Sequence, residues 1–259
     1  MKLITIDFET YYDKAFSLSK LTTEEYIRDP QFEVIGVGVQ VGELSPVWFS
    51  GTRAQTKAFL DQFDWADAAA VAHNAMFDMA ILNWHFDIRP KKIVDTLSMA
   101  RPLHTTEVGG SLAALAEYYE LGVKGTEVVN ALGKRRIDFN AAELAQYGEY
   151  CKNDVVLTYK LFSKLVRGFP ISELNLIDLT IRMFSEPVIE LDADILQFNL
   201  TQVQDHKREI LGKAMIDKDQ LMSNPQLAQL LTELGVTPPM KISPTTGRET
   251  YAFSKTDEA

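Results

Sequence analysis

Residues 3–9, LITIDFE, decide the fold, because they combine a strand pattern with two acids near the amino terminus. Side chains alternate along a strand, so Asp7 and Glu9 share one face and Phe8 lies on the other. Acids at strand ends are often simply solvated. Two acids at the carboxyl end of an otherwise apolar first strand are more informative, because ligands bind at that end of open α/β sheets.

Two further acids lie in helix-like segments far along the chain. Asp78 follows Asn74 by four residues and Asp154 follows Tyr150 by four, so each pair shares one face of its helix. The first pair has a simpler explanation, in which Asn74 caps the helix and Asp78 faces its dipole. Tyr147 also shares the face of Asp154, seven residues before it, although core packing is the more ordinary role for this residue.

Four carboxylates brought to one place repel each other unless cations lie among them. The set offers only oxygen ligands, which suits Mg²⁺ or Mn²⁺. Two such ions can activate a water and stabilise the leaving oxygen of a phosphodiester. The acids therefore predict a metal-dependent site, provided that the fold gathers them: Asp7, Glu9, Asp78 and Asp154.

Composition limits the class of protein. At 259 residues and 46% hydrophobic, the chain can bury a full core. The amino terminus has no signal-peptide pattern, and one cysteine excludes an internal disulfide framework. The longest apolar-rich run, near residues 66–88, is interrupted by Asp67, Asp78 and Asp87. These features predict a cytoplasmic protein without a membrane span. The net charge of −10 argues against a protein that coats polyanions, but not against a nuclease whose metal ions supply positive charge.

The chain begins with strands and ends with helices. The hydrophobic pattern predicts strands and two helices in the first third, with a hairpin across Gly42 and Glu43. Asn140, with Glu143 three residues later, marks the start of a long helix that runs to Leu165. The early elements are strands at 2–9, 32–41, 45–50, 68–73 and 92–95, and helices at 53–63 and from Asn74 to His85.

The order of elements predicts an α/β domain, with helices on a mixed sheet. Gly168, Phe169 and Pro170 interrupt the pattern, so we place the edge of this domain at 168 and a mainly helical segment over 169–259. Helices are expected from Ile171 to Met222, and Asn224 with Pro225 opens another that ends at Gly235. The last residues show no core-forming periodicity.

The three acidic motifs together resemble the DEDD superfamily of 3′→5′ exonucleases. Asp7-Phe8-Glu9 matches the first motif, and Asn74 to Asp78 matches the second. The third, Tyr150 to Asp154, has the Y-x-x-x-D form. Glu149 stands where the histidine form has its histidine, so the resemblance is to the tyrosine subclass, as in polymerase proofreading domains and RNase D. It covers residues 1–168 and implies a ribonuclease H-like five-stranded mixed sheet.

The resemblance also implies roles for these residues. Asp7 bridges two ions, Glu9 and Asp154 complete the first ion's site, and Asp78 holds the second ion directly or through water. Tyr150 orients the attacking water, since a phenol with a pKa of about 10 is a poor base at pH 7. The product is a 5′-nucleotide. Candidate contacts to the substrate are the neighbours of the acids: Phe8, Thr10, Asn74, Met76 and Phe77.

The last part of the chain resembles the segment that joins exonuclease to polymerase in phage-type family A DNA polymerases. The K-x-S-x-x-T-G element starts at Lys241. This implies proofreading of single-stranded DNA or a frayed primer 3′ end, in the host cytoplasm, beside a polymerase region of the same longer chain. No DNA synthesis is expected from these residues. The alternatives are a stand-alone exoribonuclease similar to RNase D and a binding domain with a decayed site.

Several other residues have simpler interpretations. His73 is expected to be structural, Cys151 to be buried packing and Asp95 to support the site without binding metal. The basic run 134–136 is either a solvated face or a contact to a nucleic acid backbone. The sequence has no phosphate-binding loop of the G-x-x-x-x-G-K-[ST] type and no serine hydrolase motif.

Overall fold

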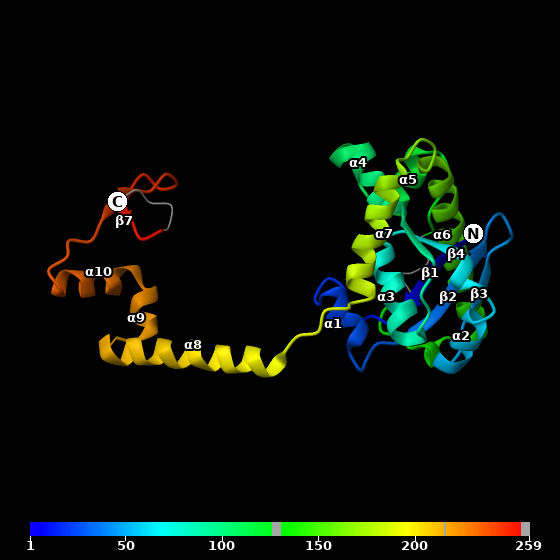
Figure 1. Ribbon diagram of the computed structural model, residues 1–259. Helices are drawn as coiled ribbons and strands as arrows, with labels where there is room; N and C mark the ends of the chain where they lie inside the picture. Colours follow the sequence, from blue (N-terminus) through cyan, green and yellow to red (C-terminus); the bar gives the residue numbers. More distant parts are fainter. Residues whose placement is uncertain (126–130, 215, 255–259) are drawn as a thin grey trace. The chain divides into compact units, whose positions relative to one another are not determined.

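A computed structural model of the chain describes residues 1–125, 131–214 and 216–254. Its centre is a five-stranded sheet with the strand order β3-β2-β1-β4-β5 (Figure 1). This confirms the predicted mixed sheet. The strands are β1 (Lys2–Thr10), β2 (Val34–Val41), β3 (Val47–Phe49), β4 (Ala68–Ala72) and β5 (Lys92–Asp95).

The first strand lies at the centre of the sheet. β1 pairs antiparallel with β2 and parallel with β4, and β5 continues the parallel side. The predicted hairpin across Gly42 joins β2 to β3. Because β1 is central, its carboxyl end carries Asp7 and Glu9 into the middle of the structure rather than to a solvated edge.

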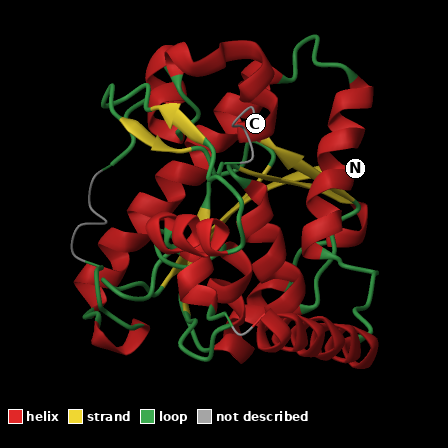
Figure 2. Ribbon diagram, turned by 90° about the vertical axis from the view of Figure 1, so that its left-hand side faces the viewer, coloured by secondary structure: helices red, strands yellow, loops and turns green. Residues whose placement is uncertain are grey.

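Helices cover both faces of the sheet; Figure 2 draws the helices in red and the strands in yellow. Gly38, which pairs with Asp7, lies against α6: a Cβ at Gly38 would come within 2.8 Å of Cys151 Sγ. Phe8 points to the other face and stacks on Phe86 of α3 at 5.9 Å. The helices of this part are α1 (Thr23–Arg28), α2 (Arg53–Leu60), α3 (Ala75–Phe86), α4 (Thr96–Val108), α5 (Leu112–Tyr118), α6 (Ala141–Leu165) and α7 (Ile171–Ser185), with 3₁₀ turns η1 (Trp65–Asp67) and η3 (Arg136–Asp138).

The start of α6 confirms its sequence signal. The Asn140 side chain accepts from the amides of Ala142 and Glu143 at 3.0 and 2.9 Å, and the Glu143 carboxylate accepts from the Asn140 amide at 3.0 Å. The two side chains thus form a capping box. This start fixes the register of a 25-residue helix, and so the face that carries Tyr150 and Asp154.

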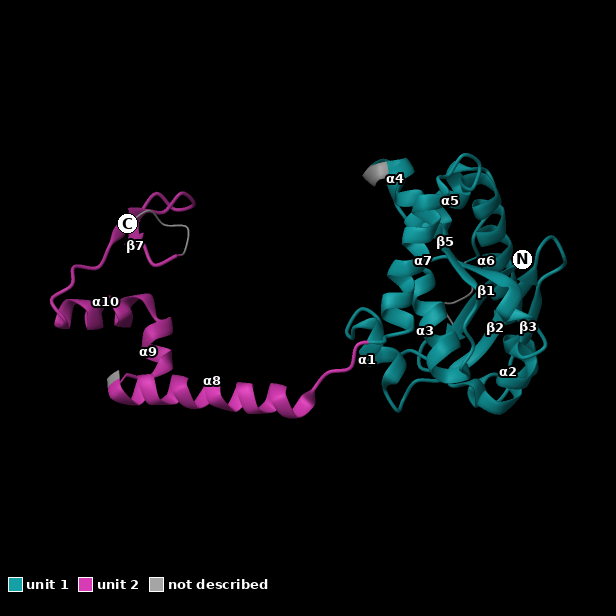
Figure 3. Ribbon diagram, viewed as in Figure 1, with its two compact units in different colours: residues 1–188 teal, residues 189–259 magenta. Residues whose placement is uncertain are grey.

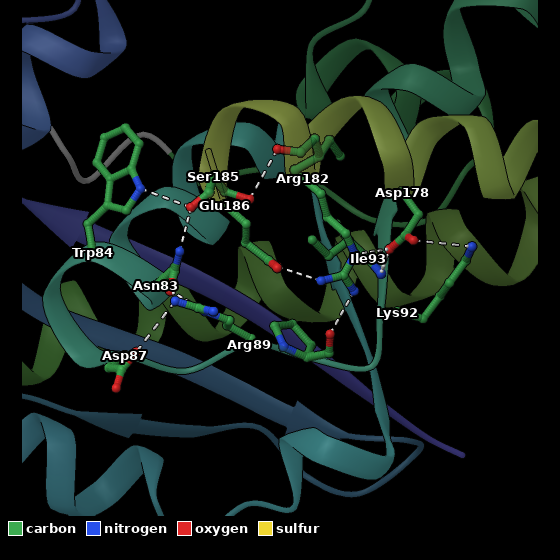
Figure 4. Close-up of polar contacts among 12 residues, drawn as sticks. Asn83, Trp84, Asp87, Arg89, Lys92, Ile93, Asp178, Arg182, Ser185 and Glu186 are labelled. Atoms are coloured by element: carbon green, nitrogen blue, oxygen red, sulfur yellow. Dashed lines mark hydrogen bonds and ion pairs between the residues drawn. The ribbon is translucent and has the colours of Figure 1, made fainter. Parts of the chain in front are cut away.

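The first compact unit ends at Val188, beyond the domain edge expected at 168 (Figure 3). The reason is α7, which Figure 4 shows tied to α3 and to the strand β5. Asp178 accepts from the Ile93 amide at 2.7 Å, and Arg182 donates to the Pro90 carbonyl at 2.7 Å. The interruption at Gly168 thus follows the end of α6 at Leu165 without ending the packed unit.

The second unit, residues 189–259, contains helices and a short hairpin. The expected helix opened by Pro225 is α10, and Gly235 beyond it has φ +79°. The hairpin was not expected from the sequence: β6 pairs antiparallel with β7, with Met240 opposite Tyr251. The elements are α8 (Ala193–Ala214), α9 (Lys218–Met222), α10 (Asn224–Glu233), β6 (Met240–Ile242) and β7 (Glu249–Tyr251). Among the described helices of both units, none combines the length and apolar character needed to cross a bilayer.

Candidate active site

The acids of the first strand lie on the face that α6 covers. Asp7 and Glu9 are half-buried there, and Cys151 Sγ lies 3.4 Å from Asp7 Oδ2. Ligand atoms of Asp7, Glu9 and Cys151 all lie within 4.8 Å of one another. Cys151 is fully buried, as expected.

Asp78 joins this group from the first turn of α3. Its side chain is 3% exposed, and Oδ1 accepts a hydrogen bond from the Phe8 amide at 3.0 Å. Phe8 stands between Asp7 and Glu9 in the strand, so this bond brings the second motif against the first. The predicted meeting of these two motifs is therefore present in the structure.

Asp154 approaches from α6 and is 4% exposed. Its Oδ2 lies 2.7 Å from Nζ of Lys124, while Oδ1 is buried and has no hydrogen-bond partner among the described residues. The ammonium of Lys124 also lies 5.5 Å from the centre of the Tyr150 ring. Sequence reasoning missed Lys124, because it stands in an aperiodic loop and no neighbouring residue marks it.

Burial and mutual repulsion make the charged forms of these acids costly. Burial, then the charge of Asp154, raises the pKa of Asp7 from 3.8 to about 7. Burial, then the charge of Asp7, raises the pKa values of both Glu9 and Asp78 well above their ordinary range. Burial also raises the pKa of Asp154, although Lys124 opposes the effect.

This donor set fits divalent cations. Four carboxylates with raised pKa values gain stabilisation from nearby positive charge, and the buried Asp154 Oδ1 is an unused oxygen ligand. Oxygen donors suit Mg²⁺ and Mn²⁺. The site can therefore hold metal through Asp7, Glu9, Asp78 and Asp154.

Two tyrosines of α6, Tyr147 and Tyr150, reach the acids. Tyr150 interacts with Asp154, and burial, then the charge of Asp154, raises its pKa above the ordinary value. Tyr147 lies nearer Glu9, and burial followed by the Glu9 charge raises its pKa. Tyr147 also stacks on Phe139 at 5.6 Å and is 4% exposed, which agrees with the packing role expected for it.

Residues 44–169 match a protein-family model described as 3′-5′ exonuclease. The chain contains a 3′-5′ exonuclease domain. The matched part includes Asp78, Tyr150 and Asp154, whereas Asp7 and Glu9 precede it. The motif order and the match agree that the protein is a nuclease enzyme.

Solved structures show the same fold at low sequence identity. RNase D of Trypanosoma brucei matches with a TM-score of 0.54 and 14% identity over 74% of this chain and 69% of that one. NrnC of Brucella melitensis matches with a TM-score of 0.52 and 14% identity over 74% and 90%. The catalytic core of RRP6 from T. brucei matches with a TM-score of 0.52 and 14% identity over 91% and 60%. The comparison with curated proteins finds no match.

Asp95 fixes the start of α3, the helix of the exonuclease domain that carries Asp78. Asp95 Oδ1 accepts from the amides of Asn74 and Ala75 at 2.8 and 3.2 Å, and its carboxylate also accepts from the first amides of α4 at 3.1 and 3.2 Å. One buried acid thus caps two helices. The support role expected for Asp95 is present, but the capping role expected for Asn74 is wrong: Asn74 has φ +66° and makes no side-chain cap.

The expected substrate contacts divide into two groups. Phe8 is 5% exposed and stacks on Phe86, and Thr10 Oγ1 lies 2.9 Å from the Tyr26 hydroxyl. Both side chains are occupied within the core, so the structure contradicts their expected roles as substrate contacts. The other three reach the surface around Asp78 and stay candidates: Asn74 is exposed, and Met76 and Phe77 are half-buried.

Two other expectations concerned His73 and the basic run 134–136. His73 is structural as expected: Nδ1 lies 2.9 Å from Thr96 Oγ1 and Nε2 lies 2.9 Å from the Gly110 carbonyl. The three residues of the basic run 134–136 differ in their ion pairs. Lys134 pairs with Glu143 and Arg135 with Glu33, at 2.8 and 3.0 Å, while the Arg136 side chain makes no such pair among the described residues.

Proposed function

We propose that the exonuclease domain holds two divalent cations and removes nucleotides one at a time from single-stranded 3′ ends, releasing 5′-mononucleotides. The observation that carries this proposal is the convergence of four acids from three elements, with Asp78 bonded to the amide between Asp7 and Glu9. Their raised pKa values indicate a site that requires cations.

The bound cations supply a nucleophile at neutral pH and stabilise charge on the departing 3′ oxygen. The chain's own residues place these charges. Asp7 lies within electrostatic reach of both Glu9 and Asp154, which suits a bridging ligand. Tyr150 stays protonated, because burial and Asp154 raise its pKa, so its hydroxyl orients the attacking water and does not remove a proton.

Single-stranded RNA is the substrate class that we favour. The solved neighbours above include RNase D and RRP6, and a further structure of NrnC is described as bound to pGG. Another structure of NrnC is described with bound Mg²⁺. These likenesses support an exoribonuclease better than the proofreading function first expected.

DNA proofreading is the second candidate, and it rests on residues 241–247. The K-x-S-x-x-T-G element there resembles the segment that precedes the polymerase region in phage-type family A enzymes. In the structure this element begins in β6 and leads toward β7. The resemblance is one of sequence alone, and it favours proofreading beside a polymerase region of the same chain.

The test compares matched RNA and DNA oligonucleotides that carry a 5′ label. With Mg²⁺, the 259-residue chain should shorten the strands stepwise from the 3′ end, and it should shorten RNA faster than DNA. EDTA should stop both reactions. Faster shortening of DNA would favour proofreading, and no shortening of either strand would contradict the exonuclease proposal.

A further inference from the structure

A hollow lined by polar and apolar residues lies at the carboxyl-terminal end of α3, whereas Asp78 of the candidate active site lies at its first turn. It has a volume of about 460 Å³, within the range of roughly 300–1,000 Å³ that is typical of small-ligand sites. We call it the arginine cavity, after the three guanidinium groups that line it: Arg28, Arg53 and Arg136. His85, which also lines it, follows Asp78 by seven residues, or about 10 Å along the helix.

The arginines keep hydrogen-bond donors available for a ligand. Arg53 donates to the His85 carbonyl through Nε and Nη2 at 3.1 and 3.0 Å, which leaves its Nη1 available to a ligand. Arg28 pairs through Nε with Glu24 at 3.1 Å and lies over the Trp84 ring at 4.1 Å. Within the described residues, neither the Nη groups of Arg28 nor the guanidinium of Arg136 has a hydrogen-bond partner.

The acids that line the arginine cavity are already engaged. Glu33 accepts from Arg135 Nη1 at 3.0 Å and from the Arg136 amide at 3.2 Å. Asp29 accepts from the Gln31 amide at 2.7 Å. Arg28 is paired with Glu24 and Glu33 with Arg135, so the guanidinium groups of Arg53 and Arg136 outnumber the remaining carboxylate, Asp29, in a chain whose net charge is −10.

The titration of His85 agrees with this positive field. Burial lowers its pKa, and the charges of Arg53 and Arg28 lower it further. Its Nε2 lies 3.0 Å from the Ile27 carbonyl, so the neutral ring carries its proton on that nitrogen. His85 therefore adds no charge of its own, and its lowered pKa reflects the nearby charges of Arg53 and Arg28.

The rest of the lining is apolar. Phe32 stacks on His85 at 4.7 Å, Val34 is half-buried, and Ile137 is 79% exposed at the rim. Guanidinium groups bind phosphate through paired N–H donors, whereas an apolar wall favours a flat, weakly polar body. A ligand that matches both parts has a phosphate at one end and a ring system at the other.

We propose that the arginine cavity is a nucleotide-binding site separate from the acids, with the arginines on the phosphate and the apolar wall against the base. The choice of a nucleotide rests on the function proposed above, because the reaction consumes and releases nucleotides. Two sources share this chemistry: a released 5′-mononucleotide and an upstream nucleotide of the bound strand.

The test measures binding in EDTA, so that the acids neither hold metal nor cleave. AMP and dAMP are titrated by calorimetry into the 259-residue chain, and a 5′-fluorescent single strand is followed by anisotropy. The test variant is Arg28→Gln with Arg136→Gln. The control, Arg101→Gln with Arg248→Gln, removes the same charge from exposed residues outside the cavity.

The test variant should bind one probe at least about tenfold more weakly, and the control should change affinity less than about twofold. Loss of mononucleotide binding identifies the free nucleotide as the ligand. Loss of strand binding alone, with a shallower salt dependence, identifies the strand. Unchanged binding of both probes, or no binding by the unmodified chain, overturns the proposal.

This outcome is distinct from failure of the proposed function. If the unmodified chain does not shorten strands in Mg²⁺, the exonuclease proposal fails even where the arginine variant loses binding. If strands are shortened but binding is unaffected by Arg28→Gln with Arg136→Gln, only the arginine cavity assignment fails.

Discussion

The two ends of α3 carry opposite charges for different reasons. At its first turn, Asp78 is 3% exposed and its pKa is raised by burial and by Asp7. At its last turn, exposed Arg53 donates twice to the His85 carbonyl. The helix dipole favours both signs where they stand, so the sign of the charge does not reveal function. The extent of burial distinguishes the two ends. The exposed Arg53 stabilises a helix end, whereas the buried Asp78 costs stability unless a cation is near.

The largest effect is expected at the acidic end, for Asp7→Ala. Removal of the central acid should reduce Mg²⁺-dependent shortening of a labelled strand by at least about a thousandfold, because it removes charge that positions the cations. Circular dichroism should stay close to that of the unmodified chain. Activity within about tenfold of the original would show that the acids are not the catalytic centre.

The next largest effect is expected for Asp95→Ala, which tests how the acidic end is held. Asp95 caps both α3 and α4, and each lost cap costs about 0.5–2 kcal/mol. We expect urea unfolding to report a loss of about 1–4 kcal/mol, the sum of two caps. Ser111→Ala, which removes the cap of α5 alone, serves as the control and should cost about 1 kcal/mol. Equal losses in the two variants would contradict the double-capping role.

Tyr150→Phe tests which tyrosine serves the acids. It removes the hydroxyl beside Asp154 and should lower kcat about tenfold to a hundredfold, far less than Asp7→Ala. Tyr147→Phe should affect kcat less, since Tyr147 packs against Phe139. A larger loss of kcat for Tyr147→Phe would reverse the assignment.

The smallest effect concerns pH and separates the two ends directly. Without metal, Asp7 has a pKa of about 7 when folded against 3.8 as an ordinary value, so the folded state binds more protons between these values. Stability should therefore fall as pH rises from about 4 to 7, whereas arginines do not titrate there.

Differential scanning calorimetry in EDTA measures this dependence. The expected fall in Tm is several degrees, given about 2–4 °C per kcal/mol for a chain of this size. Asp7→Asn should flatten the dependence. A Tm that does not change with pH, or an unaltered slope in Asp7→Asn, would contradict the burial of charged Asp7.

Sequence reasoning reached most of the sheet unit because its signals were local. Alternation in residues 2–9 and the capping box at Asn140 each act within a few residues, and both are present. The helices α1 and α4 were missed. α1 has only six residues, and α4 contains Pro102 in its interior, which weakens its pattern.

The errors in the site arose from long-range contacts. Asn74 was taken for the cap of α3, but the capping carboxylate comes from Asp95, across the parallel pair β4–β5. Phe8 and Thr10 were placed beside the substrate because of their sequence neighbours, but strand alternation turns Phe8 away, and Tyr26 binds Thr10. Lys124 comes from a loop whose position depends on tertiary structure.

The central claim is that the buried acids form one cation site. Calorimetric titration of Mn²⁺ into the metal-free chain at pH 8 tests it most directly, with Asp7→Asn and Asp78→Asn measured in parallel. We expect saturable binding by the unmodified chain and a loss of at least about tenfold in affinity in each variant. Equal Mn²⁺ binding by all three proteins would contradict the claim.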